Sequence, residues 1–170
     1  MDEREWTDAP LAVGDTIGCM EADVTRLPDL PMWLITGDLT GLQGDDGSAQ
    51  APAGLADQID LGAFSIRIGR DRLLAGGETV WTVVDPQSKK CALSRADGLY
   101  SILRIAGPRA DQLIRRGTSV DLSVQSPSAA IRFAGLTTLL LRDQEGFLLF
   151  VEAAWLTYLS SFFRRYAEPG

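Results

Sequence analysis

The chain has 170 residues, of which 45% are hydrophobic, and its 16 basic and 23 acidic residues give a net charge of −7. A chain of this size buries about 70% of its unfolded surface, so it needs no disulfide or metal to hold a core. The acidic balance argues against a nucleic-acid partner, because such a surface needs clustered Lys and Arg. No apolar run approaches the ~20 residues of a membrane span, and residues 1–8 lack a signal-like apolar core. We therefore expect a cytoplasmic protein with no membrane partner.

The chain contains no histidine and only two cysteines, Cys19 and Cys91. The absence of histidine excludes Ser-His-Asp and Cys-His catalysis and imidazole metal ligands. The cysteines have no CxxC spacing and give no zinc motif; a disulfide between them stays open, although a reduced state is favoured in a cytoplasmic protein. We expect no catalytic residue and no metal site in this chain, and the cofactor-binding residues are unknown from the sequence.

The first half of the chain predicts few regular elements. Residues 6–26 show no clean hydrophobic period. Gly, Asp, Ser and Pro dominate residues 40–54, which predicts a mobile surface loop. In chain order, the predicted elements are a buried strand at 32–35, one or two helical turns at 55–61, a half-buried strand at 64–68, a short connection at 69–77, a strand at 79–84 and a short strand at 91–93.

The second half has a clearer pattern. Gly107-Pro108 predicts a turn, with Pro108 at the first helical position and Gly117 as the C-terminal stop of a short amphipathic helix. Asp143–Gly146 predicts the loop of a hairpin. In chain order, the predicted elements are a strand at 100–105, that helix, strands at 131–134, 137–142 and 147–151, and a terminal helix over 155–166.

These elements predict an α+β fold of antiparallel sheets with helices on one face, built from units close to the ferredoxin-like type. We expect one compact unit. Two packed halves, at 1–95 and 96–170, are the alternative. The second of these halves is the ferredoxin-like one.

The segment Ser101–Asp111 (SILRIAGPRAD), followed by LIRRG at 113–117 and VDL at 120–122, resembles the gamma subunit of heterotetrameric sarcosine oxidase, a bacterial enzyme. The resemblance continues through the hairpin strands to the aromatic terminal helix and covers about the last 75 residues. Upstream, only PMWLITGD at 31–38 is similar. The family's Gly-Pro-Asp-Glu-Trp-Leu-Leu motif is degraded, at best into 84–90, and Thr118 and Ser128 replace its cysteines. The chain thus resembles a divergent member that is somewhat short.

The resemblance implies a fold like that of the folate-binding aminomethyltransferases and an accessory, non-catalytic role. In the family's holoenzyme, the beta subunit carries FAD and oxidises sarcosine, and FMN lies between alpha and beta. Alpha binds NAD and tetrahydrofolate, which takes up the one-carbon unit, and delta binds zinc. The implied partners of this chain are therefore alpha, beta and delta subunits, and the chain itself holds no cofactor. Two alternatives remain open: a stand-alone folate-binding protein of the aminomethyltransferase type, and an orphan interaction module.

Several residues admit a functional reading beside a structural one. Asp45, Asp46 and Asp57 lack the spacing of an EF-hand, which favours a loop. Asp97 is a candidate pterin ligand, but Asp97-Gly98 is better explained as a turn. Asp121 belongs to a structural Leu-Asp-Leu segment.

Three basic pairs and the terminal aromatics complete the candidates. Lys89-Lys90, Arg115-Arg116 and Arg164-Arg165 are best explained as solvated surface. The aromatic residues of the terminal helix fit either core alone or core plus a partner interface. They are Trp155, Tyr158, Phe162, Phe163 and Tyr166.

Overall fold

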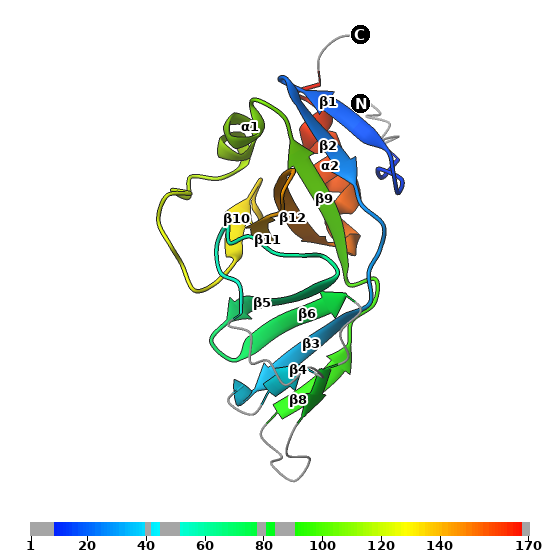
Figure 1. Cartoon of the computed structure of the whole chain (residues 1–170). Coiled ribbons are helices and arrows are strands. Elements are labelled where there is room, and N and C mark those ends of the chain that lie inside the picture. The colour runs from blue at the N-terminus through cyan, green and yellow to red at the C-terminus, as the bar shows by residue number, and fades with distance from the viewer. Residues whose placement is uncertain (1–8, 40–41, 45–51, 78–80, 84–90, 168–170) are drawn as a thin grey trace, which may run out of the picture.

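A computed structural model describes residues 9–39, 42–44, 52–77, 81–83 and 91–167. Its largest element is a six-stranded antiparallel sheet (Figure 1). In spatial order, the strands are β1 (Thr16–Cys19), β2 (Ala22–Arg26), β9 (Tyr100–Ala106), β12 (Gly146–Glu152), β11 (Leu136–Arg142) and β10 (Ala130–Phe133).

A four-stranded antiparallel sheet lies below the larger sheet in the view of Figure 1. Its order is β5 (Ala63–Gly69), β6 (Arg72–Gly77), β3 (Met32–Gly37) and β8 (Cys91–Arg95). The strands β4 (Leu42–Gly44) and β7 (Trp81–Val83) form a separate antiparallel pair.

Both helices cover one face of the six-stranded sheet. They are α1 (Ala110–Gly117) and α2 (Leu156–Arg164), the latter preceded by a short 3-10 turn at Ala153–Trp155. Leu113 of α1 and Leu159 and Phe163 of α2 share a core with Leu103 and Leu149 of the sheet. The predicted arrangement of two helices on one face is therefore confirmed. None of the described helices is long and apolar enough to cross a membrane.

The opposite face of the six-stranded sheet packs against the four-stranded sheet. Strand β12 shows how, because its side chains alternate between two cores. Leu149 lies among the helices, whereas Leu148 and Phe150 lie in the second core with Phe64 of β5 and Leu74 of β6. Strand β12 is thus buried on both faces, which explains its continuous apolar sequence.

Residues 53–59 join β5, at the edge of the four-stranded sheet, to the end of β11 in the six-stranded sheet. The amide of Ala53 donates to the carbonyl of Ser65 on β5 at 2.8 Å, and that of Ile59 donates to the carbonyl of Arg142 on β11 at 2.9 Å. The helical turns predicted over 55–61 are therefore wrong, since these backbone groups bond to strands rather than to each other. The short LADQIDL run has too few residues to make an apolar helical face against a competing sheet edge.

Other segments of the first half also differ from prediction. Residues 16–26 form β1 and β2, and residues 72–77 form β6 rather than a connection. The described part of the 40–54 segment includes strand β4 and backbone pairing at Ala53. Strand pairing supplied by distant segments overrides the weak local signals of these short strands.

The sheets divide the chain differently from a boundary at residues 95 and 96. Strand β2 pairs with β9, so residues 16–26 belong to the same sheet as β9 to β12.

The order of elements from β9 onward is strand, helix, three strands, helix. A ferredoxin-like unit would have a helix between its third and fourth strands, whereas a tight hairpin joins β11 to β12.

Gly117 ends α1, as predicted, but close packing explains why it is glycine. A Cβ there would lie 2.4 Å from the ring of Phe133, which is fully buried and contacts Phe162 and Phe163. Pro108 lies two residues before the helix begins, rather than at its first position, and Gly107 adopts φ +118° beside the β1–β2 hairpin.

We expect Gly117→Ala to destabilise the protein, although alanine favours a helix by up to about 1 kcal/mol. Overpacking a buried ring costs about 1–3 kcal/mol, so the clash outweighs the propensity. Urea unfolding of the variant measures the difference. Gly135→Ala is a poor control because φ is +84° there; Gln112→Ala, on the exposed face of α1, is a control in which helix propensity rises slightly without a steric clash. An unchanged or raised midpoint for Gly117→Ala would contradict the prediction.

Candidate functional site

A cleft of about 450 Å³ opens where the segment that joins the two sheets and leads into β5 (the joining segment, residues 53–61) meets the β11–β12 hairpin. One wall is the end of the joining segment and the other is Arg104 with the hairpin loop. The lining residues are Gln58, Ile59, Asp60, Leu61, Arg104, Asp143, Gln144 and Glu145. The cleft carries charged side chains on both walls, with Asp60 on one and Arg104, Asp143 and Glu145 on the other.

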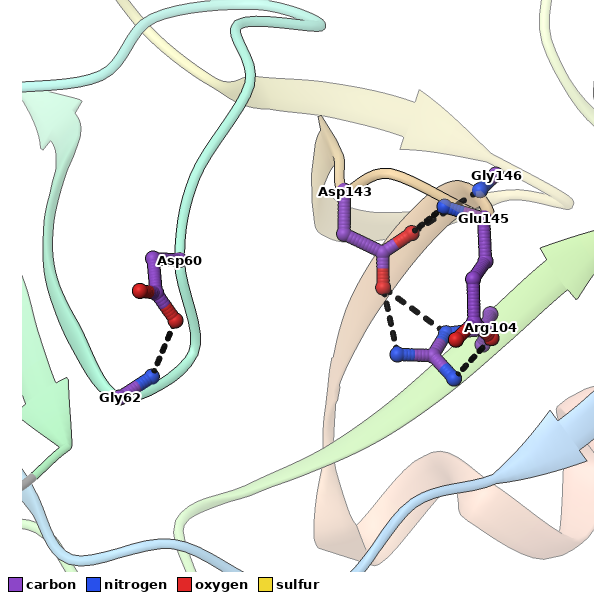
Figure 2. Close-up of polar contacts among 6 residues, drawn as sticks. All are labelled: Asp60, Gly62, Arg104, Asp143, Glu145 and Gly146. Atoms are coloured by element: carbon purple, nitrogen blue, oxygen red, sulfur yellow. Dashed lines mark hydrogen bonds and ion pairs between the residues drawn. The ribbon is translucent and has the colours of Figure 1, made fainter.

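Arg104 lies on β9, and its guanidinium group is held by two carboxylates of the hairpin loop (Figure 2). Its Nε donates to Asp143 Oδ2 at 2.8 Å, and Nη2 lies 2.6 Å from the same oxygen. Its Nη1 donates to Glu145 Oε2 at 2.5 Å. The Asp143 side chain is only 11% exposed and that of Arg104 is 25% exposed, so this contact is largely shielded from water.

The other oxygen of Asp143 organises the hairpin loop itself. Its Oδ1 accepts the amides of Glu145 and Gly146, each at 2.9 Å. A Cβ on Gly146 would lie 2.3 Å from the carbonyl oxygen of Ile105, so the close approach of β9 requires glycine there. The Asp143 carboxylate therefore organises the loop through Oδ1 and joins it to Arg104 of β9 through Oδ2.

Asp60 stands on the opposite wall of the cleft. Its Oδ1 accepts the amide of Gly62 at 2.8 Å and so forms the turn into β5 (Figure 2). Figure 2 shows no contact between Asp60 and the Arg104 cluster. The cleft thus has carboxylates on both walls and a single guanidinium group that two of them already hold.

The chemistry available in the cleft is limited. Its lining contains no Cys, Ser, Thr, Lys or Tyr, so its side chains offer no nucleophile except carboxylates. The ion pairs of Arg104 with Asp143 and Glu145 fix the hairpin loop to β9, beside the junction of the two sheets. We call these three residues the ion-pair clamp. Sequence reasoning missed this cluster; its only signal was an arginine within the largely apolar strand predicted at 100–105.

Asp97, the candidate pterin ligand, lies in a turn, and both of its oxygens are used within the chain. Oδ1 accepts the amide of Met32 at 3.0 Å, and Oδ2 pairs with Nε of Arg95. Gly98 has φ +72°, as a turn glycine does. The amide of Met32 and then Arg95 lower the pKa of Asp97. The turn reading agrees with this geometry, in which Asp97 ties the start of β3 to the end of β8.

We expect Asp97→Asn to be destabilising at pH 7 and nearly neutral at low pH. Because the folded-state pKa lies below the unfolded value of about 3.9, the carboxylate stabilises the fold above pH 4 and loses this effect as the pH falls through the folded-state pKa. Urea midpoints of wild type and variant at pH 7 and pH 3 measure the gap. Asp29→Asn is a control in an exposed surface ion pair. A gap that widens toward acid would contradict the prediction.

The other polar candidates have local structural roles. Asp121 Oδ1 accepts the amide of Ser123 at 2.9 Å and its hydroxyl at 2.8 Å, which lowers the pKa of Asp121. Ser128 donates its hydroxyl to the carbonyl of Ile68 at 2.9 Å and so pins the end of β5. Asp57 Oδ2 accepts the amide of Gly54 at 2.7 Å.

Both cysteines are free thiols. Cys19 is buried and donates its thiol to the carbonyl of Phe163 at 3.3 Å, near the end of α2. Burial, followed by the charge of Asp38, raises the pKa of Cys91.

Some candidates fall outside the described residues: Asp45, Asp46, Lys89, Lys90 and the 84–90 motif. Over the rest of the chain, no group of three or more Cys, Asp or Glu side chains is arranged to hold a metal ion.

Comparison with known proteins finds a similar fold among solved structures. No family model and no curated protein matches the sequence. Among solved structures, the chain is similar to a chain of the heterotetrameric sarcosine oxidase from Corynebacterium sp. U-96, solved in complex with pyrrole 2-carboxylate. The TM-score is 0.59 at 12% identity, over 91% of this chain and 90% of the other. The two chains thus share one fold over about nine-tenths of their lengths.

Proposed function

We propose that this chain is an accessory, non-catalytic subunit of gamma type in a sarcosine-oxidase-like complex that demethylates N-methyl amines. The observation that carries the proposal is the extent of the shared fold, which covers about nine-tenths of both chains. The shared fold therefore extends over most of this chain and most of one chain of a heterotetrameric enzyme, which supports a role as a subunit.

The residues described above fit an accessory role. The charged groups of the cleft are used to hold a hairpin, and Asp97 and Asp121 are used to hold turns. In the proposed complex, other subunits supply FAD, FMN, NAD, tetrahydrofolate and zinc. They oxidise sarcosine to glycine and pass the one-carbon unit to tetrahydrofolate. This chain contributes to the assembly of those subunits.

Co-expression with the products of the adjacent open reading frames tests the proposal. We expect an affinity tag on this chain to recover a yellow complex that contains all four subunits and oxidises sarcosine or another N-methyl amine. A colourless monomer that ignores these subunits would refute it. Tetrahydrofolate titration of that monomer, followed by tryptophan fluorescence, would then test the stand-alone folate-binding alternative.

A further inference from the structure

Strand β8 lies at one end of the four-stranded sheet, and its outer edge is not closed by any described segment (Figure 1). The other edges of the two large sheets are closed. At β1, Cys19 bridges Ala167, and Ala53 pairs in parallel with β5. Beside β10, the amide of Ala134 donates to the carbonyl of Gly117 at 2.7 Å. Among the described residues, by contrast, β8 pairs only with β3.

The side chains of β8 leave this edge unprotected. Residues 92–95 are all exposed, on both faces of the strand, and Leu93 is 36% exposed. Natural sheet edges are commonly protected by proline, a bulge or a charged side chain. Strand β8 contains no proline and pairs with β3 without a register shift. Its single charged residue, Arg95, lies at the end of the strand and forms an ion pair with Asp97. The edge is therefore locally neutral and accessible.

The pairing with β3 determines which backbone groups of β8 face outward. The amide of Ala96 donates to the carbonyl of Met32 at 2.8 Å. Hydrogen-bonded and non-hydrogen-bonded pairs alternate along an antiparallel ladder, so the even-numbered residues of β8 bond to β3. The N–H and C=O groups of Cys91, Leu93 and Arg95 consequently face away from the sheet. The complement of such a row of backbone groups is another extended strand.

We propose that two copies of this chain pair antiparallel through β8, about a two-fold axis at Leu93. In this register, Leu93 lies opposite Leu93 of the second copy, and Cys91 lies opposite Arg95. Each outward-facing N–H and C=O group of the strand then has a partner, because these residues occupy the hydrogen-bonded positions. The leucines contact each other at the axis, and no like charges lie opposite one another. The contact is isologous, so it closes after two copies.

The size of the contact sets its strength. Strand β8 has five residues, so pairing it with a second copy buries less than about 1,000 Å² and forms a weak dimer. We expect a Kd on the order of 10–100 µM. The dimer adds a contact to the proposed subunit and does not rest on that function, because the chain alone supplies both strands.

Analytical ultracentrifugation of the purified full chain, from about 1 to 200 µM, tests the dimer. Leu93→Asp places two carboxylates opposite each other at the axis and should raise Kd by at least about 10-fold. Val124→Asp is the matched control: Val124 is 59% exposed and lies between α1 and β10, so this variant should dimerise as wild type. Thermal melts confirm that both variants are folded.

Disulfide formation between single-cysteine chains tests the register. In the proposed dimer, Ala92 of one copy and Ser94 of the other form a non-hydrogen-bonded pair, with Cα atoms about 4.5 Å apart. This distance suits a disulfide, whereas the diagonal distance between two copies of the same residue is about 7–8 Å. With Cys91→Ser as background and Cys19 buried, a mixture of Ala92→Cys and Ser94→Cys chains should therefore oxidise to a covalent dimer. Either chain alone should remain uncrosslinked.

Three results would overturn the proposal. The first is a wild-type chain that stays monomeric up to about 200 µM, which would leave the edge to an extended segment of a different chain. The second is a dimer that Leu93→Asp does not weaken. The third is an equal disulfide yield from the mixed and the separate cysteine chains. None of these results affects the proposed function, because the experiments contain no oxidase subunit.

Discussion

Arg104→Met should unfold at a markedly lower urea concentration than wild type, with a loss of about 2–4 kcal/mol. Methionine keeps much of the volume but removes the cation, so Asp143 is left largely buried with its Oδ2 unpaired. The free-energy cost of a largely buried, unpaired carboxylate exceeds the net stabilisation that the ion pair contributes. The hairpin loop that Asp143 organises also loses its anchor on β9.

Two further variants isolate the pair. Glu145→Gln should change stability by less than about 1 kcal/mol, because the Glu145 side chain is 65% exposed. Combining Arg104→Met with Asp143→Asn should cost less than the sum of the two single changes, since each single change strands the other partner. Additive effects would show that the clamp is not a coupled unit.

Phe150→Ala should have the largest effect on stability, a loss of about 3–5 kcal/mol. Phe150 is fully buried in the core between the two sheets, and its ring meets that of Phe64 edge-on with centroids 5.7 Å apart. Removing it leaves a cavity that neither sheet can fill alone. A loss of this size is a large part of the 5–15 kcal/mol that stabilises a typical domain.

The same variant tests whether the chain is one cooperative unit. Trp33 lies on β3 of the four-stranded sheet and Trp155 lies beside α2, so single-tryptophan chains report each region separately. We expect both reporters to give one midpoint, and Phe150→Ala to lower both equally. Separate midpoints would show that the sheets unfold independently. Leu93→Ala, an exposed change on β8, should shift neither by more than about 0.5 kcal/mol.

Local pattern and tertiary structure contributed different parts of this fold. The strands β9, β11 and β12, helix α1 and the terminal helix were predicted closely, because each has a strong apolar period and a turn signal at its ends. The α+β class and the placement of both helices on one face followed from them. The resemblance carried by residues 101–122 pointed to heterotetrameric sarcosine oxidase, and the structural comparison then found a chain of such an enzyme to be similar.

The first half was predicted poorly for a physical reason. Strands β1, β2 and β6 are short and carry mixed sequences, and the pairing of β2 with β9 and of β6 with β3 joins segments that are far apart in the chain. The same holds for residues 53–59, which look locally like a short helix but join β5 of one sheet to the end of β11 in the other. Apolar period, capping and composition are local, so the amino-acid sequence by itself determined the class, the C-terminal elements and the absence of histidine chemistry. Tertiary packing alone decided which strands pair. It also decided that Arg104 is held by a hairpin about 40 residues away. Ion pairs and strand pairing join residues that are far apart in the chain, and such pairs produce no periodic pattern in the sequence.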